Sequence, residues 1–122
     1  MKTKWPPLAT PQQHAAVTDY AQHLLAKYGS RILRLALFGS VARGDFTPYS
    51  DIDVLVVADE VSPDFKAAVR QISYDVSLDR DVVLNVHVKA RARWEAMRAK
   101  GEALWRNVEQ DGVDLLPQPV AA

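Results

Sequence analysis

Apolar residues recur at spacings of three and four in three segments of the chain, the pattern of helices that bury one face. The first segment follows Thr10 and Pro11, which are typical of a helix start, and the second follows the similar signal at residues 62–64. The third segment contains Gly101, where a break is expected, and Gly112 ends it. The pattern therefore predicts helices over residues 11–28, from 63 through 76, and over 91–110.

Three shorter segments are mostly apolar and are bounded by glycine or polar residues, as is typical of strands in a buried sheet. They cover residues 33–38, 51–58 and 81–88. Together with the helices they predict an α/β (α+β) fold, in which a small mixed sheet of three to four strands is flanked by helices. We expect an N-terminal arm over residues 1–10, one domain over 11–115 and a frayed tail over 116–122.

Composition narrows the class of protein. The chain has 122 residues, 48% of them hydrophobic, which suits one domain with one core. Its 15 Lys and Arg balance 15 Asp and Glu, so it lacks the surplus of positive charge that general nucleic-acid and anionic-membrane binders need. The absence of cysteine excludes disulfides, thiolate metal sites and a cysteine nucleophile. No apolar run is long enough to span a bilayer, and a cytoplasmic protein is expected.

Candidate chemistry is concentrated between the first two predicted strands. The first strand ends in Gly39-Ser40, and the second opens with Asp51-Ile52-Asp53 after a spacer of ten residues. Side chains two apart on a strand share a face, so Asp51 and Asp53 are expected to project together, as a pair of hard oxygen ligands that suits Mg²⁺ or Mn²⁺. A glycine-serine turn offers backbone N–H groups and a hydroxyl to phosphate oxygens. Each piece alone is more often a plain turn or a solvated strand end, but together they predict a metal-phosphate site.

The segment over about residues 32–58 resembles the nucleotidyltransferase superfamily related to DNA polymerase beta, in particular its minimal nucleotidyltransferase branch. The matching residues are Gly39, Ser40, Ala42, Arg43, Gly44, Ser50, Asp51, Ile52 and Asp53. The resemblance implies the nucleotidyltransferase fold, Mg²⁺ or Mn²⁺ as cofactor, and a nucleoside triphosphate substrate, with ATP expected. It also implies metal binding and catalysis by Asp51 and Asp53, and nucleotide binding by Gly39, Ser40, Arg43 and Ser50.

The resemblance further implies a third catalytic and metal-binding carboxylate on a later strand. Asp81 is the candidate, because it opens the third predicted strand. Two alternatives stay open: Asp79 could take this role from two residues earlier, and Asp81 could simply cap the entry to the strand.

Other polar and aromatic residues have both structural and functional interpretations. Arg43 lies in the spacer, where a guanidinium can bind a triphosphate, although a solvent-facing loop arginine is the alternative. We interpret His14 and His23 as structural, and His87 as a surface histidine that could instead face the site. The stripe that contains Trp94 and Trp105 is expected to belong to the core, with its exposed remainder and nearby arginines available to a partner.

The resemblance implies transfer of AMP from ATP to a hydroxyl. Small members of the branch are commonly antitoxins paired with a HEPN-type protein, so a hydroxyl on such a partner is the expected acceptor, and a homo- or hetero-oligomer is expected. The balanced charge disfavours a nucleic-acid acceptor, and no membrane partner is expected. The alternatives are a small-molecule enzyme of the aminoglycoside-modifying kind, and a degenerate member that binds nucleotide or partner without turnover. Lack of the third carboxylate would favour the last.

Overall fold

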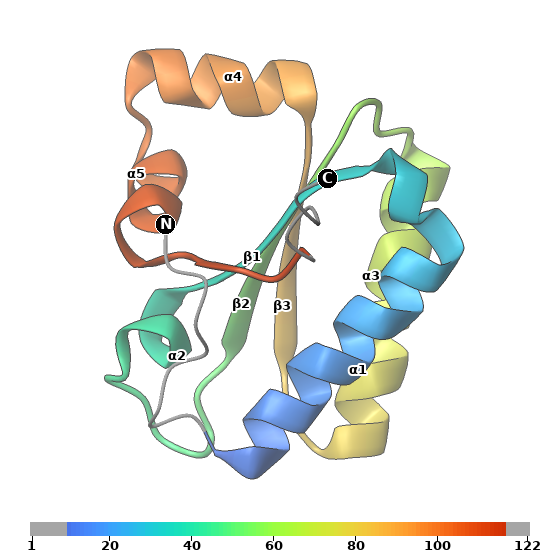
Figure 1. Cartoon of the computed structure of the whole chain (residues 1–122), viewed down its shortest axis with the longest axis vertical. Coiled ribbons are helices and arrows are strands. Elements are labelled where there is room, and N and C mark those ends of the chain that lie inside the picture. The colour runs from blue at the N-terminus through green and yellow to red at the C-terminus, as the bar shows by residue number, and fades with distance from the viewer. Residues whose placement is uncertain (1–9, 117–122) are drawn as a thin grey trace, which may run out of the picture.

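The structure is a computed structural model that describes residues 10–116, so the predicted arm and tail lie almost entirely outside the described residues. Figure 1 shows the arrangement of the elements along the chain. The helices are α1 (Pro11–Tyr28), α2 (Gly39–Arg43), α3 (Pro63–Arg80), α4 (Arg91–Lys100) and α5 (Ala103–Asp111), with the short 3₁₀ helix η1 (Gly29–Arg31). The strands are β1 (Ile32–Phe38), β2 (Ile52–Ala58), β3 (Leu84–Ala90) and β4 (Val113–Asp114).

The strands form one mixed sheet in the order β3-β2-β1-β4, which confirms the predicted fold class. Strand β1 is antiparallel to β2 and to β4, whereas β2 and β3 are parallel. The parallel pair is joined through α3, as strands that run in the same direction need a long crossover connection.

Among the described helices, none is long and apolar enough to cross a membrane.

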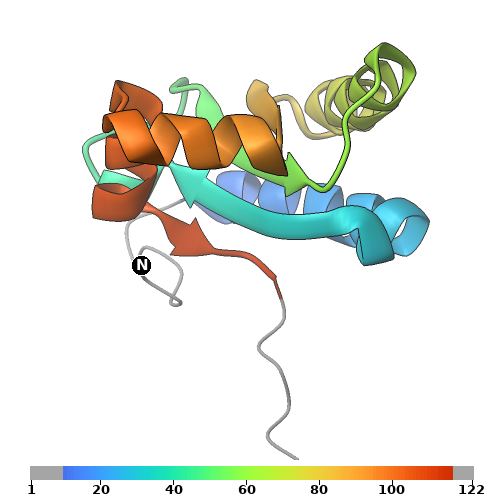
Figure 2. The same ribbon diagram turned by 90° about the horizontal axis from the view of Figure 1, so that it is seen from above.

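Helices cover both faces of this sheet. Figure 1 shows α1 and α3 side by side against one face, and Figure 2, seen from above, shows α4 and α5 on the other. Successive β2 side chains alternate between the two layers: Val54 packs with the first and Leu55 with the second, and both are fully buried. The C-terminal half of this strand is therefore buried on both faces, as its continuous run of apolar residues predicts.

Helix α1 begins and ends where the sequence pattern predicts. The Thr10 hydroxyl accepts the Gln13 N–H, and the Gln13 side chain accepts the Thr10 N–H, a capping box with Pro11 in the first turn. The buried Gln13 amide also donates to the Thr47 carbonyl at 3.2 Å. The start of α1 is thereby attached to the loop that precedes β2.

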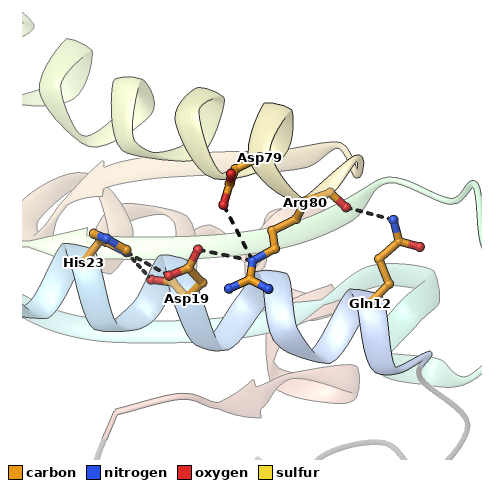
Figure 3. Close-up of polar contacts among 5 residues, drawn as sticks. All are labelled: Gln12, Asp19, His23, Asp79 and Arg80. Carbon is orange, nitrogen blue, oxygen red and sulfur yellow. Dashed lines mark hydrogen bonds and ion pairs between the residues drawn. The ribbon is translucent and has the colours of Figure 1, made fainter.

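Polar contacts hold the outer sides of α1 and α3 together (Figure 3). Arg80 Nε lies 3.4 Å from Asp19 Oδ2, and the Gln12 side-chain amide donates to the Arg80 carbonyl at 2.8 Å. Asp79 extends toward the same guanidinium, with its Oδ2 4.0 Å from Arg80 Nε. Asp79 is therefore part of a helix surface, not of a strand.

The third strand begins later than predicted. Helix α3 continues to Arg80, and Asp81 follows it as a C-cap in the left-handed conformation, at φ 55°. Strand β3 starts at Leu84, where pairing with β2 begins at Ile52. The prediction that Asp81 opens the third strand is wrong because this aspartate ends the helix, a use of the left-handed region that Asp and Asn tolerate better than most residues.

The predicted C-terminal helix is interrupted, as expected, at Gly101. Its backbone is left-handed, at φ 64°, and divides the segment into α4 and α5. Trp94 is buried in the second layer, and Trp105 packs against that layer while remaining partly exposed. The interpretation of this stripe as core is confirmed.

Candidate active site

The turn between β1 and β2 brings Gly39 against the Asp53 side chain. Antiparallel pairing places Phe38 opposite Asp53, and Gly39 follows with its backbone at φ 79°. A Cβ built on Gly39 would collide with Asp53 Oδ2. Glycine is therefore required at this position for two reasons: the left-handed backbone and the close approach of the carboxylate.

Gly39→Ala tests this close packing. The alanine is expected to lower the free energy of unfolding by about 1 to 2 kcal/mol through its left-handed backbone. It should also displace the Asp53 carboxylate and weaken the predicted Mg²⁺-dependent binding of ATP. Chemical denaturation and calorimetric titration measure the two effects.

Two other glycines serve as controls for Gly39→Ala. Gly101→Ala introduces the backbone strain without the collision, because its φ is 64° and nothing lies within 4 Å of its added Cβ. Gly29→Ala introduces neither, because its φ is −49°. Normal ATP binding by Gly39→Ala, or equally weakened binding by Gly101→Ala, would contradict the proposed contact with Asp53.

Gly39 and Ser40 form the first turn of the short helix α2. No side chain caps this turn, so its backbone N–H groups are available to an acceptor such as a phosphate oxygen. The turn is closed on its other side by Gly44, whose N–H donates to the Ser40 carbonyl at 3.0 Å. The predicted glycine-serine turn is thus placed directly beside the predicted carboxylates.

Asp51 and Asp53 flank a residue that is turned into the core. Ile52 is fully buried beneath α1 and α3, whereas Asp51 is exposed and Asp53 is half-buried. The Ile52 N–H donates to the Val83 carbonyl at 2.8 Å and fixes the entry of β2 into the sheet. The alternation along the backbone directs both carboxylates away from the α1–α3 layer.

Strand β3 places two side chains beside Asp53 that are not among the predicted site residues. Asn85 is the register partner of Asp53, and its side-chain amide donates to Asp53 Oδ1 at 3.1 Å. His87 Nε2 lies 3.6 Å from the same oxygen, is buried, and has no hydrogen-bond partner among the described residues. The histidine ring packs against Phe38, with centroids 5.2 Å apart. The His87 side chain is 32% exposed, and its Nε2 faces Asp53, so the structure supports the alternative in which this histidine faces the site.

Asp81 is not brought to this cluster. A carboxylate on β3 would have to occupy position 85 or 87 to face Asp53, and these positions hold asparagine and histidine. Within residues 10–116, no three His, Asp or Glu side chains lie close enough to share a metal ion. The structure therefore does not assemble Asp51, Asp53 and Asp81 into one centre.

Arg43 and Ser50 are engaged in contacts within the protein. The Arg43 guanidinium lies 3.3 Å from Asp45 and 3.4 Å from Asp111, and hydrogen bonds to these two carboxylates raise its pKa above the usual range. The Ser50 hydroxyl accepts the Thr47 N–H at 2.9 Å and shapes the loop that leads to Asp51. Both residues hold the borders of the site in place, and their contact with nucleotide stays a prediction.

The donor set at this site suits a divalent ion that arrives with its substrate. Asp51 and Asp53 offer carboxylate oxygens, and Asn85 orients one of those on Asp53. Mg²⁺ characteristically takes one or two protein carboxylates and completes its shell with phosphate oxygens and water. Two carboxylates beside the predicted phosphate-binding turn therefore fit Mg²⁺ bound with a nucleotide better than a permanent ion held by protein alone.

Comparison with known proteins assigns the family. Residues 19–109 match the sequence model of the family described as Nucleotidyltransferase domain, and the match covers more than half of the chain. The chain belongs to this family, as the resemblance of its Gly-Ser and Asp-x-Asp segments implied.

The similar proteins include a curated relative and solved structures. MJ0604 of Methanocaldococcus jannaschii, provisionally named a protein adenylyltransferase, is 47% identical over 47 residues, or 38% of this chain and 47% of the relative. The chain thus spans about half the length of that relative. A toxin-antitoxin crystal structure with AMP-PNP has a TM-score of 0.56 at 19% identity, over 84% of this chain and 74% of the other. A minimal nucleotidyltransferase structure has a TM-score of 0.53 at 22% identity, over 86% and 92%. The two structures share the fold.

Proposed function

We propose that the protein transfers AMP from ATP to a hydroxyl group on a partner protein, as the antitoxin of a pair with a HEPN-type partner. The observation that carries this proposal is the contact of Gly39 with Asp53, which joins a phosphate-binding turn to a carboxylate pair. Family membership supports nucleotidyl transfer. The AMP-PNP in the toxin-antitoxin structure supports an adenine nucleotide, since this molecule is an analogue of ATP.

Each part of the site has a role in this proposal. Asp51 and Asp53 would hold Mg²⁺, which when bound would neutralise charge on the triphosphate and on the leaving pyrophosphate. The N–H groups of Gly39 and Ser40 bind phosphate oxygens, and the Ser40 hydroxyl adds a further donor. Asn85 holds Asp53 in position through the hydrogen bond to Oδ1. No nucleophilic side chain is required: the acceptor oxygen forms its bond to the α-phosphorus as the bond to pyrophosphate breaks, and the hydroxyl proton passes to water.

The assignment of a protein as acceptor rests on the relatives and on the balance of charge. The curated relative is named for adenylyl transfer to proteins, and one solved neighbour is a toxin-antitoxin. The formal net charge of zero disfavours a nucleic-acid acceptor, because binding a nucleic acid requires a surplus of positive charge that displaces its counterions.

The direct test uses the protein together with the product of its neighbouring gene. After incubation with ATP and Mg²⁺, intact-mass spectrometry should show one or more added AMP groups on the partner. EDTA should prevent the addition. An unmodified partner together with efficient adenylylation of a small hydroxyl compound would replace this proposal with a small-molecule enzyme.

Binding of nucleotide without turnover is the second candidate function. It is favoured by Asn85, because the position on β3 that faces Asp53 lacks a carboxylate. An amide can orient Asp53, but it cannot take a proton from an acceptor hydroxyl as a carboxylate can. Saturable binding of ATP with no product on either kind of acceptor would support this candidate.

A further inference from the structure

A pocket of about 490 Å³ lies at the end of the sheet opposite the candidate active site. It is formed where β3 ends and where α3 and α4 begin, and Figure 1 shows both helix starts at the end of the sheet away from α2. Because β2 and β3 are parallel and the active-site residues stand at their amino ends, the pocket is at the carboxyl end of β3. Carboxyl ends of parallel strands are a common place for ligand crevices in α/β sheets.

The pocket is lined by positive charge. Its cationic residues are Lys66 from α3, Lys89 from β3 and Arg93 from α4, and no Asp or Glu is among the lining residues. Arg93 is matched by Glu102 through two contacts of 3.1 and 3.2 Å. The side-chain ammonium groups of Lys66 and Lys89 have no hydrogen bond or ion pair within the described part of the chain, and neither has the guanidinium of the nearby Arg70. The pocket therefore holds positive charge that the protein does not neutralise.

Burial and the neighbouring positive charges both act on the pKa of Lys89. Burial lowers the pKa of its ammonium group below the usual range, and the charges of Lys66, Arg93 and Arg70 lower it further, against the opposite effect of Glu102. An anion beside Lys89 would stabilise the charged ammonium group and so raise this pKa.

The N-terminus of α4 adds to the positive potential of the pocket. Ala90 precedes the helix without a side-chain cap, and the first turn holds no acidic residue. Arg91 and Arg93 stand there instead, although cations are unfavourable near the positive end of a helix dipole. Arg91 and Arg93 have counter-ions within the protein, Asp59 and Glu102, so the feature of this turn that is open to an anion is its uncapped N–H groups.

We propose that this pocket binds a phosphate-bearing small molecule, held by Lys66, Lys89 and the backbone N–H groups of the first turn of α4. The volume falls within the range of small-molecule sites, roughly 300 to 1,000 Å³. The net charge of zero argues against a nucleic-acid backbone as the source of the phosphate. This site does not depend on the proposed transfer reaction, because it shares no residue with Asp51, Asp53 or the α2 turn.

Inorganic phosphate and pyrophosphate are the probes for this site. In metal-free buffer with EDTA at constant ionic strength, ¹H–¹⁵N NMR should show saturable shifts at the amides of residues 89–93. The paired substitution Lys66→Gln/Lys89→Gln should weaken pyrophosphate binding by at least about tenfold, because charge-assisted contacts to phosphate are lost. The Lys89 ammonium pKa, followed in the wild-type protein by its ¹³Cε shift, should rise when pyrophosphate binds.

Matched variants separate this pocket from general attraction and from the active site. Lys27→Gln/Lys100→Gln removes the same charge elsewhere and should leave the binding seen at residues 89–93 unchanged. The proposal is overturned by equal weakening in the control pair, by shifts confined to residues 39–44, by shifts that do not saturate, or by an unchanged Lys89 pKa. Tighter binding of a short single-stranded RNA than of pyrophosphate at residues 89–93 would overturn the assignment to a small molecule.

Discussion

Asp53→Asn is expected to lower the proposed Mg²⁺-dependent AMP transfer by at least about a thousandfold, because one of the two carboxylates proposed to bind the metal is lost. The fold should remain intact. The introduced amide oxygen can still accept the hydrogen bond from Asn85, and repulsion between neighbouring carboxylates is relieved. Transfer from radiolabelled ATP measures the rate, and thermal unfolding in EDTA measures stability.

The matched control for Asp53→Asn is Asp59→Asn, which makes the same change just beyond the other end of β2. Asp59 is exposed and lies 3.6 Å from Arg91 Nε, away from the Gly39 turn. The control variant should transfer AMP at the wild-type rate. Equal rates for Asp53→Asn and the wild-type protein would remove Asp53 from the mechanism and with it the proposed metal site.

The part of the candidate site whose placement could be predicted from the sequence is the part built from neighbouring residues. Gly39-Ser40 follows one strand and Asp51-Ile52-Asp53 enters the next, and the pairing of Phe38 with Asp53 then brings the two segments together. The residue types, the turn and the alternation of side chains are all visible in the linear pattern. The close contact between Gly39 and Asp53 needs the register of the strands, which that pattern does not contain.

The contribution of β3 was missed because it depends on where a helix ends. The run Asp81-Val82-Val83-Leu84 has the composition of a strand, but α3 continues to Arg80 and Asp81 adopts the left-handed cap. Pairing with β2 then sets position 85 beside Asp53. The alternation of Asn85 and His87 with apolar neighbours was a signal that both share a face, although only the parallel register shows which residue they meet.

Asn85→Asp is expected to make the stability of the protein strongly dependent on Mg²⁺. Without metal the variant should unfold at a lower temperature than the wild-type protein, because the hydrogen bond to Asp53 Oδ1 is replaced by repulsion between two carboxylates. With Mg²⁺ and ATP the third carboxylate becomes a further oxygen ligand, so the Tm should recover and rise more than that of the wild-type protein. Differential scanning calorimetry with EDTA, Mg²⁺, and Mg²⁺ with ATP checks this.

The same substitution distinguishes the two candidate functions. If a missing carboxylate limits turnover, Asn85→Asp should raise the rate of AMP transfer by about tenfold or more, as a further metal ligand and proton acceptor is restored beside Asp53. Asn85→Ala is the control, because it removes the hydrogen bond without adding charge, and it should gain neither Mg²⁺-dependent stability nor rate. A Tm of Asn85→Asp that does not respond to Mg²⁺ would show that no ion binds between β2 and β3. The phosphate-binding turn and Asp51 would then have to bind nucleotide without a metal held at Asp53.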